Sequence, residues 1–263
     1  MNPGLIPLQG RTYAVAVAAV VWVTACASGA RSGSQATDAR SSTPSALLDR
    51  AIAQAGGAAA LTRARALTWE GDAIVNAGGR VVQLAGTWAI QPPDTAVVST
   101  FEVARGPGSV RALVVAAPRG WLVTDAGVSP MAPAMLANER DEFYLYEVMR
   151  LVPLRDAAVS LTPLPADSLG QAGFRAERAD RPTVDLYVDS LGRLARLRTQ
   201  VRDVAGGPAV SQDISLSGTI ESGGVRWFRD LRISLNGQPF FALTLRTLRV
   251  HERVEDARLK GPG

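Results

Sequence analysis

The stretch LARLRTQVR, residues 194–202, shows the clearest strand pattern in the chain. Successive side chains of a β-strand point to opposite faces, so residues two apart share a face. One face here carries Ala195, Leu197, Thr199 and Val201, and the other carries Arg196, Arg198, Gln200 and Arg202. The pattern predicts a strand with one dry face and one arginine-rich face that meets solvent.

Segments of similar character lie on both sides of this stretch. Together with 194–202, the expected strands are 67–75, 80–90, 96–103, 110–116, 120–124, 174–177, 183–189, 210–220, 225–235 and 240–254. Glycine and proline turn signals separate the early strands at 78–79, 92–93, 106–108 and 118. The chain therefore predicts about eleven strands joined by short turns.

A short helix is expected before the first strand, over residues 44–55. Thr43 is a suitable N-cap, and Pro44 suits the first helical position, where its missing N–H has no helical partner. Gly56 and Gly57 follow as a stop signal.

A second helix is expected in the middle of the strand series, over residues 139–151. Asn138 is the candidate N-cap, and Pro153 is expected to end the helix, because proline disfavours helical geometry just before it. The apolar face of this helix is formed by Leu145, Val148, Met149 and Val152.

These elements define the fold class. No break in composition divides the region into two domains, and a sheet of about eleven strands has to curl. We predict a mainly β fold: a single antiparallel curled sheet, forming an open half-barrel wrapped around a few short helices.

The N-terminal residues have the pattern of a bacterial export signal. Arg11 and the amino terminus form a positive start, and the apolar run TYAVAVAAVVWVTA at 12–25 leads directly to Cys26. A signal peptide needs an apolar run of about 7–15 residues with small residues at the cut, whereas a membrane-spanning helix needs about 20. Residues 1–25 are therefore predicted to be a signal peptide.

The sequence Val23-Thr24-Ala25-Cys26 resembles the lipobox of bacterial lipoproteins, with valine where leucine is usual. The resemblance implies cleavage before Cys26 and diacylglycerol on its thiol, which with further acyl chains would anchor the protein stably. Ala27 in place of aspartate implies anchoring in the outer membrane, facing the periplasm. The alternative is an ordinary secretory signal followed by a chance cysteine.

The segment after Cys26 differs from the rest of the chain in composition. SGARSGSQATDARSSTPS, residues 28–45, contains no large apolar side chain, so it cannot offset its own ordering entropy. We expect a flexible tether over 26–44, a folded domain over 45–256 and a tail over 257–263.

Composition limits the classes of partner. The 263 residues carry a net charge of +4, and removing residues 1–25 takes away Arg11 and no acid, which leaves +3. A surplus this small argues against a nucleic-acid partner. Cys26 is the only cysteine, which excludes an intrachain disulfide and a multi-cysteine metal site.

No motif in the sequence has a recognisable catalytic or cofactor chemistry. His251 is the only histidine, and HERVE at 251–255 lacks the second histidine of a zinc-protease helix. No serine lies in a G-x-S-x-G elbow. Glu139, Asp141 and Glu142 cluster at the expected start of the second helix, where they would complement the helix dipole. We predict no catalytic residue, no metal and no cofactor, and we do not expect an enzyme.

Three segments resemble parts of a known family. Ala64–Trp69 leads from a helix into the first strand, VDLYVDSLGRL at 184–194 is a strand–turn–strand, and GGVRW at 223–227 precedes NGQP at 236–239. In this order, over residues 45–256, they resemble the periplasmic lipoprotein carrier and its outer-membrane receptor (LolA/LolB-like proteins). The resemblance implies an open barrel lined with apolar side chains, a helical lid and bound acyl chains. The carrier's gating arginine and the receptor's loop leucine have no match here, so the resemblance implies lipid binding rather than lipoprotein transfer.

Large apolar residues around the second helix are the candidate ligand-binding residues. They are Trp69, Trp88, Phe101, Trp121, Phe143, Tyr146 and Met149. Either they line a cavity, because a curled sheet of about eleven strands is wide enough to leave room for a ligand, or they simply fill a core.

Two functional hypotheses follow. The first is a membrane-anchored lipoprotein of the cell envelope that binds acyl chains or another apolar ligand in the half-barrel. The alternative is a non-enzymatic interaction or sensor module whose partner is another envelope protein.

Overall fold

The computed structural model describes residues 43–77, 79–202 and 208–261. The predicted signal peptide, Cys26 and nearly all of the expected tether lie outside the described residues. No helix in the described ranges has the length and apolar composition needed to span a bilayer.

One large antiparallel sheet dominates the described residues, with thirteen strands. In order across the sheet they are β6 (Gly127–Pro130), β5 (Arg119–Thr124), β4 (Arg111–Ala116), β3 (Thr95–Glu102), β2 (Arg80–Gln91), β1 (Ala66–Ala77), β15 (Gln238–His251), β14 (Asp230–Leu235), β11 (Val210–Ser217), β10 (Leu194–Val201), β9 (Val184–Val188), β8 (Ala172–Arg178) and β7 (Val159–Leu164). The sheet is not closed, because β6 and β7 form its two edges. The predicted open antiparallel sheet is confirmed.

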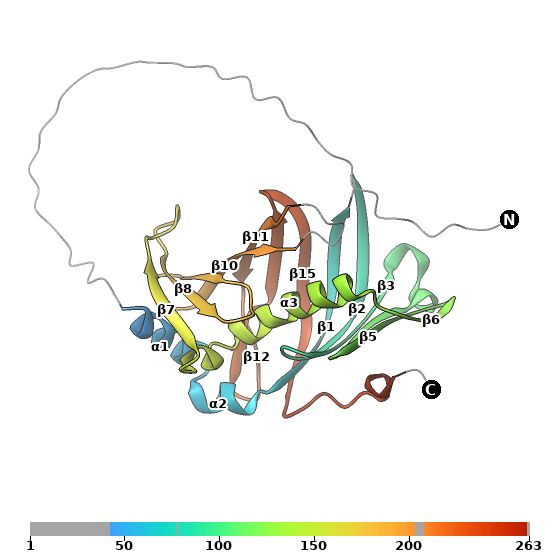
Figure 1. The fold of residues 1–263 in the computed structure, drawn as a ribbon, viewed down its shortest axis with the longest axis horizontal. Coiled ribbons are helices and arrows are strands. Elements are labelled where there is room, and N and C mark those ends of the chain that lie inside the picture. Colours follow the sequence, from blue (N-terminus) through green and yellow to red (C-terminus); the bar gives the residue numbers. More distant parts are fainter. Residues whose placement is uncertain (1–42, 78, 203–207, 262–263) are drawn as a thin grey trace, which may run out of the picture. The chain divides into compact units, whose positions relative to one another are not determined.

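Helices cover one face of this sheet. They are α1 (Pro44–Gln54), α2 (Ala58–Arg63) and α3 (Pro133–Met149). The described residues also contain short 3₁₀ helices at 103–105, 107–109, 152–155 and 257–260, which are not all on this face. Figure 1 shows α3 lying across the curved sheet, with α1 beside β7 and β8. A small hairpin of β12 (Ile220–Ser222) and β13 (Val225–Trp227) forms a separate two-stranded sheet. We call the face covered by α3 the inner face and the opposite face the outer face.

The first helix forms as its sequence predicts. Thr43 is the N-cap, and its hydroxyl accepts a hydrogen bond of 3.2 Å from the backbone N–H of Ala46. The chain leaves the helix through Gly56, whose φ of 110° is accessible to glycine and strained for other residues.

The second predicted helix starts earlier than expected. α3 begins at Pro133, which takes the first helical position, and Asn138 lies inside the helix rather than at its N-cap. Glu139 and Glu142 therefore lie beyond the first turn, and our interpretation of them as partners of the helix dipole was wrong. The helix ends at Met149, four residues before Pro153, because Leu151 adopts a positive φ of 62°.

The sheet has more strands than the eleven or so expected. The two missed strands of the sheet are its edges, and both contain proline, Pro130 in β6 and Pro163 in β7. Proline lacks the N–H that a central strand needs, so it is tolerated at an edge and hides the strand pattern. The expected strand 225–235 is split by Phe228 and Arg229 into β13 and β14.

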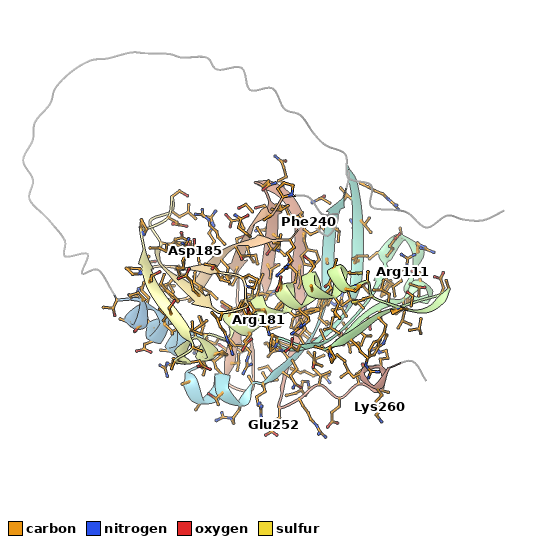
Figure 2. All side chains as sticks on the ribbon, viewed as in Figure 1. Arg111, Arg181, Asp185, Phe240, Glu252 and Lys260 are labelled. Carbon is orange, nitrogen blue, oxygen red and sulfur yellow. The ribbon has the colours of Figure 1, made fainter. Side chains whose placement is uncertain are left out.

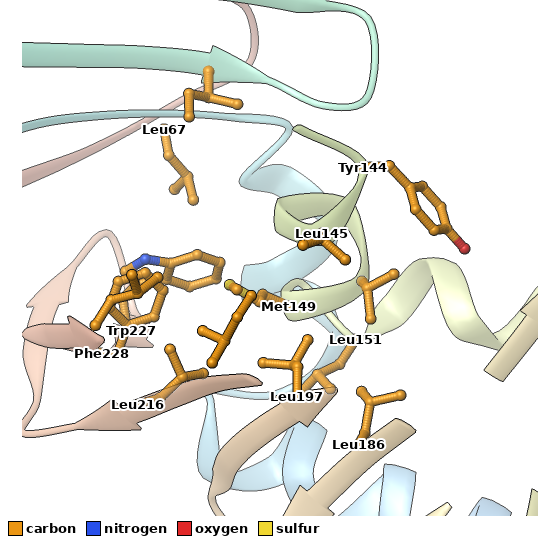
Figure 3. Close-up of a cluster of buried hydrophobic side chains, with 14 of the residues drawn as sticks. Leu67, Tyr144, Leu145, Met149, Leu151, Leu186, Leu197, Leu216, Trp227 and Phe228 are labelled. Atoms are coloured by element: carbon orange, nitrogen blue, oxygen red, sulfur yellow. The ribbon is translucent and has the colours of Figure 1, made fainter. Parts of the chain in front are cut away.

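The main hydrophobic core lies between the inner face and the helices. Its members come from both halves of the sheet and from all three α-helices, and Figure 3 shows Leu145, Met149, Leu151, Leu186, Leu197, Leu216 and Trp227 among them. A smaller cluster of Val97, Val114 and Trp121 lies apart from this core and is covered by Leu259.

Side chains cover the outside of the fold in Figure 2, where Asp185 and Arg111 are labelled. On β8 to β11 many of these side chains form ion pairs. The Arg196 Nε atom lies 2.7 Å from Asp213 Oδ1, and the Arg175 Nε atom lies 2.6 Å from Asp185 Oδ1. The predicted arginine-rich face of 194–202 is thus an outer face whose charges are largely paired.

Candidate functional site

One side of α3 faces the sheet along the whole helix. Met135, Glu139, Glu142, Tyr146 and Met149 are spaced by four, three, four and three residues, which places them in one line on a helix. Contacts with the sheet confirm the orientation, since Tyr146 packs on Trp69 and Glu142 bonds to Gln212. This line of five residues is called the α3 stripe below.

Aromatic rings surround the middle of the α3 stripe. Trp69 on β1 stacks on Trp88 on β2 with ring centroids 6.5 Å apart, and it meets Tyr146 at 5.4 Å. Phe143 lies 6.5 Å from Tyr146. Such ring pairs stabilise a core by about 0.5–1.5 kcal/mol beyond the area they bury.

A pocket of about 610 Å³ opens at the C-terminal end of the α3 stripe. Its floor is formed by buried apolar side chains from α3, the loop after it, β11, β13 and the residue after β13, namely Met149, Leu151, Leu216, Trp227 and Phe228. Figure 3 shows Met149 and Leu216 beside Trp227 and Phe228. The two aromatic rings of the floor, Trp227 and Phe228, have centroids 5.0 Å apart.

The rim of the pocket is polar and charged. It carries Asp189, Arg193, Glu221 and Arg226, with Leu191 exposed between them. Two buried polar atoms of lining residues, Trp227 Nε1 and Gln171 Oε1, have no hydrogen-bond partner in the described part of the chain. A volume of about 300–1,000 Å³ with an apolar floor is typical of small-molecule sites. In this pocket the polar and charged lining residues are nearly as numerous as the apolar ones.

Two carboxyl groups of the α3 stripe have unusual acidity. Burial, and then the charge of Glu142, raises the pKa of Glu139 from its ordinary 4.5 to about 7. Burial raises the pKa of Glu142 to about 6, although its hydrogen bond with Gln212 acts in the opposite direction. Burial also raises the pKa of Tyr146 above its usual range.

The predicted ligand-binding residues fall into two groups. Five of the seven meet around α3: Trp69, Trp88, Phe143, Tyr146 and Met149. Only Met149 also lines the 610 Å³ pocket. The other two, Phe101 and Trp121, lie on the outer face.

Strand register explains why these two residues point away from the site. Val98 is paired with Trp88 and shares its inner face, so Phe101, three residues further along β3, points outward. Trp121 is paired with Val114, which is paired with Val97, and these three form the smaller cluster.

Sequence reasoning missed several residues of the site. Glu139 and Glu142 were assigned to a helix start, and Gln212, Trp227 and Phe228 were not proposed for the site. The spacing of the α3 stripe could have placed both glutamates beside Tyr146, if the helix had been started at Pro133.

A second hollow lies on the outer face. It has a volume of about 760 Å³ and is bounded by β1 to β3 and by residues 251–258, including His251 and Arg258. The Arg258 Nη1 atom donates to Ser99 Oγ at 2.6 Å, and Val254 N donates to Gln91 Oε1 at 3.0 Å. Charged groups of the C-terminal segment thus form much of this hollow, and its lining has few apolar side chains.

Solved structures of known proteins share this architecture. A DUF1329 family protein from Desulfovibrio piger superposes with a TM-score of 0.53 at 11% sequence identity, covering 82% of this chain and 97% of that one. A LolA superfamily protein from Nitrosomonas europaea superposes with a TM-score of 0.51, also at 11% identity and with the same coverage. The fold is LolA-like. The resemblance drawn from the sequence is confirmed for the fold, while no family model and no curated protein matches the sequence itself.

Among the described residues of this LolA-like domain, no three histidine, cysteine, aspartate or glutamate side chains are grouped so that they could hold a metal ion. The side chains of the site offer apolar contact, together with the carboxyl groups of the α3 stripe and the charged rim of the pocket.

Proposed function

We propose that this protein is a lipid-anchored protein of the bacterial envelope that binds an acyl chain, or another apolar ligand, between α3 and the inner face of its sheet. The observation that carries the proposal is the pocket of about 610 Å³ with an apolar floor at the end of α3. The LolA-like fold supports it, because the resemblance to lipoprotein carriers implies bound acyl chains and a LolA superfamily protein shares the fold.

Binding would use the pocket in two parts. The apolar chain would lie on the floor, where burying each CH₂ group stabilises a complex by about 0.8 kcal/mol. The rim carries charged side chains of both signs, Asp189 and Glu221 beside Arg193 and Arg226, so it can contact polar parts of a ligand without fixing the sign of their charge. This role is a binding role and assigns no catalytic residue.

Blocking the pocket tests the proposal. The chain from residue 26 with Cys26→Ser, which keeps every described residue, is titrated with a fluorescent fatty acid. Ala195 lines the pocket, so Ala195→Trp should lower the affinity at least about tenfold, since the indole occupies ligand space. Ser99 lines the outer hollow, so Ser99→Trp is the matched control and should leave the affinity unchanged.

Native mass spectrometry of the same protein, purified from bacteria, should show bound lipid that Ala195→Trp removes. A wild-type protein that carries no lipid after purification and does not bind the fluorescent fatty acid would contradict the proposal.

The anchor is tested separately in cells. The wild-type chain should incorporate labelled fatty acid and fractionate with membranes, and Cys26→Ser should abolish both. A wild-type chain that takes up no label, with a Cys26→Ser variant still in the membrane fraction, would contradict the anchor and leave the pocket proposal standing.

A further inference from the structure

Glu139 and Glu142 have no basic partner among the described residues, which sets them apart from the two other carboxyl groups of α3. Glu147, on the same helix, lies 3.7 Å from Arg178, and Asp141 lies 2.9 Å from Arg202. Among the described residues no arginine, lysine or histidine forms an ion pair with Glu139 or Glu142. Two partly buried carboxyl groups without a cation destabilise the ligand-free fold, so their place facing the sheet calls for another explanation.

The side chain opposite Glu142 also lacks a partner. Gln212 on β11 is only 2% exposed, and its Nε2 atom donates to both carboxylate oxygens of Glu142 at 3.0 and 3.1 Å. Its Oε1 atom is buried without a hydrogen-bond partner in the described ranges. Thr199, which faces Gln212 across the strands, cannot supply one, because its hydroxyl donates to the carbonyl oxygen of Thr183 at 2.8 Å.

Apart from the Gln212 Nε2 group, which already donates to Glu142, the polar atoms named here are acceptors. The free oxygen of Gln212 and the carboxylates of Glu139 and Glu142 require N–H or O–H donors, and their two negative charges favour a cation. A protonated amine carries three N–H donors and one positive charge on a compact group, which matches this set. Two carboxylates and one amide oxygen are too few to hold a divalent metal without several further ligands.

Apolar side chains lie next to the acceptors on the inner face. Gln212 is two residues before Ile214 on β11, and Ile214 is paired with Ile233, which is paired with Phe241. Ile233 and Phe241 are only partly buried, so they remain available for contact. A ligand that reaches Glu142 and Gln212 therefore also meets an apolar surface on the same face of the sheet.

We propose that Glu139, Glu142 and Gln212 bind the protonated amine of an amphiphile whose apolar chain lies along the inner face of the sheet. The inference rests on the proposed function, because it specifies the polar end of the apolar ligand. It differs from a purely apolar site in one measurable way: a chain that ends in an ammonium group must bind better than the same chain without charge.

Three probes with one chain length test this difference. Dodecylammonium, dodecanol and dodecanoate, each below its micelle concentration, are titrated into the Cys26→Ser chain by calorimetry at pH 8. The wild type should bind dodecylammonium at least about tenfold more tightly than dodecanol, since a charge-assisted contact is worth about 1.5–3 kcal/mol. Dodecanoate should bind more weakly than both.

Variants assign the preference to the named groups. Glu139→Gln/Glu142→Gln keeps the shape of both side chains and should bind dodecylammonium and dodecanol with equal affinity. Asp141→Asn removes a carboxylate on the same helix that is paired with Arg202, so it should keep the preference. Equal affinity of the wild type for dodecylammonium and dodecanol, or a preference that survives in the double variant, would overturn the inference. Binding of dodecanol would in either case uphold the proposed function. Failure of all three probes to bind would contradict the proposed function and the inference together.

Discussion

Carboxyl groups occur in two different settings on the two faces of the sheet. On the outer face, burial raises the pKa of Asp213, but hydrogen bonds and charges from Arg196 and Arg198 outweigh burial and hold the pKa below its usual range. On the inner face, burial raises the pKa of Glu139 and Glu142, and no arginine opposes it. The same chemical group thus stabilises the fold on one face and destabilises it on the other.

The difference separates carboxylates that stabilise the fold by pairing with arginine from carboxylates that lower its stability. Outer carboxylates link neighbouring strands, as Asp213 does for β10 and β11 and Asp185 does for β8 and β9. Of the two unpaired glutamates of α3, Glu142 links the helix to Gln212 on β11. Groups that are retained at a cost in stability, beside apolar side chains, are candidates for ligand contact.

The largest effect is expected from the aromatic centre of the inner face. Trp69 is fully buried and contacts both Trp88 and Tyr146, so Trp69→Ala should lower the free energy of unfolding by about 3–5 kcal/mol. Phe101 lies on the outer face and is only partly buried, so Phe101→Ala should lower the free energy of unfolding by about 1 kcal/mol. Urea unfolding of the two variants measures the contrast, and equal losses would show that the faces are not packed differently.

Breaking the outer network should have the next largest effect. Arg196 bonds to Asp213 and, at 3.1 Å, to Asp167, so Arg196→Ala leaves two carboxylates without their shared partner. We expect a loss of about 1–3 kcal/mol in urea unfolding. Arg202→Ala breaks the more exposed pair with Asp141 and is the control, with an expected loss below about 1 kcal/mol. An unchanged free energy of unfolding in Arg196→Ala would show that the paired outer carboxylates do not stabilise the fold.

The inner carboxyl groups should reveal themselves in the pH dependence of stability. Their pKa values are raised from 4.5 to about 7 and about 6, so the folded chain binds more protons than the unfolded chain within this window. The free energy of unfolding contributed by these groups is therefore highest below pH 4.5 and falls as the pH rises through 7.

Glu139→Gln/Glu142→Gln should remove that fall. Between pH 4.5 and 8 the wild type should lose about 1–3 kcal/mol more than the double variant, measured by urea unfolding at each pH. Contributions from the outer aspartates are shared by both proteins and cancel in the difference. Parallel profiles would mean that the two glutamates titrate as they do in the unfolded chain.

The smallest effect on stability is expected at Leu259, which packs against the smaller hydrophobic cluster of the outer face. Leu259 packs on the cluster of Val97, Val114 and Trp121, so Leu259→Ala should cost about 0.5–1 kcal/mol. Leu169 is 72% exposed, so Leu169→Ala should leave the stability unchanged. Thermal unfolding of the two variants measures the difference. If the two variants behaved alike, the C-terminal segment would not contribute to the stability of the outer face.

Much of the fold could be read from local patterns. The alternation in 194–202 and the turn signals between early strands predicted strands that the structure confirms, and Thr43 with Pro44 marked the start of α1. The edge strands β6 and β7 were missed, because proline and short length weaken the pattern at edges. The beginning of α3 was placed too late, because Asn138 is a plausible N-cap by residue type although it lies inside the helix that begins at Pro133.

The sequence by itself established the period of each element, because alternation and helical spacing are properties of neighbouring residues. It also marked the strand that carries Leu197 inward and Arg196 outward. Which large side chains meet was decided only by the tertiary structure. Trp69, Trp88 and Tyr146 come together, and Trp121 does not, because the pairing of distant strands assigns each residue to a face. The unpartnered state of Glu139 and Glu142 depends in the same way on what the sheet brings opposite α3, and no local pattern contains that information.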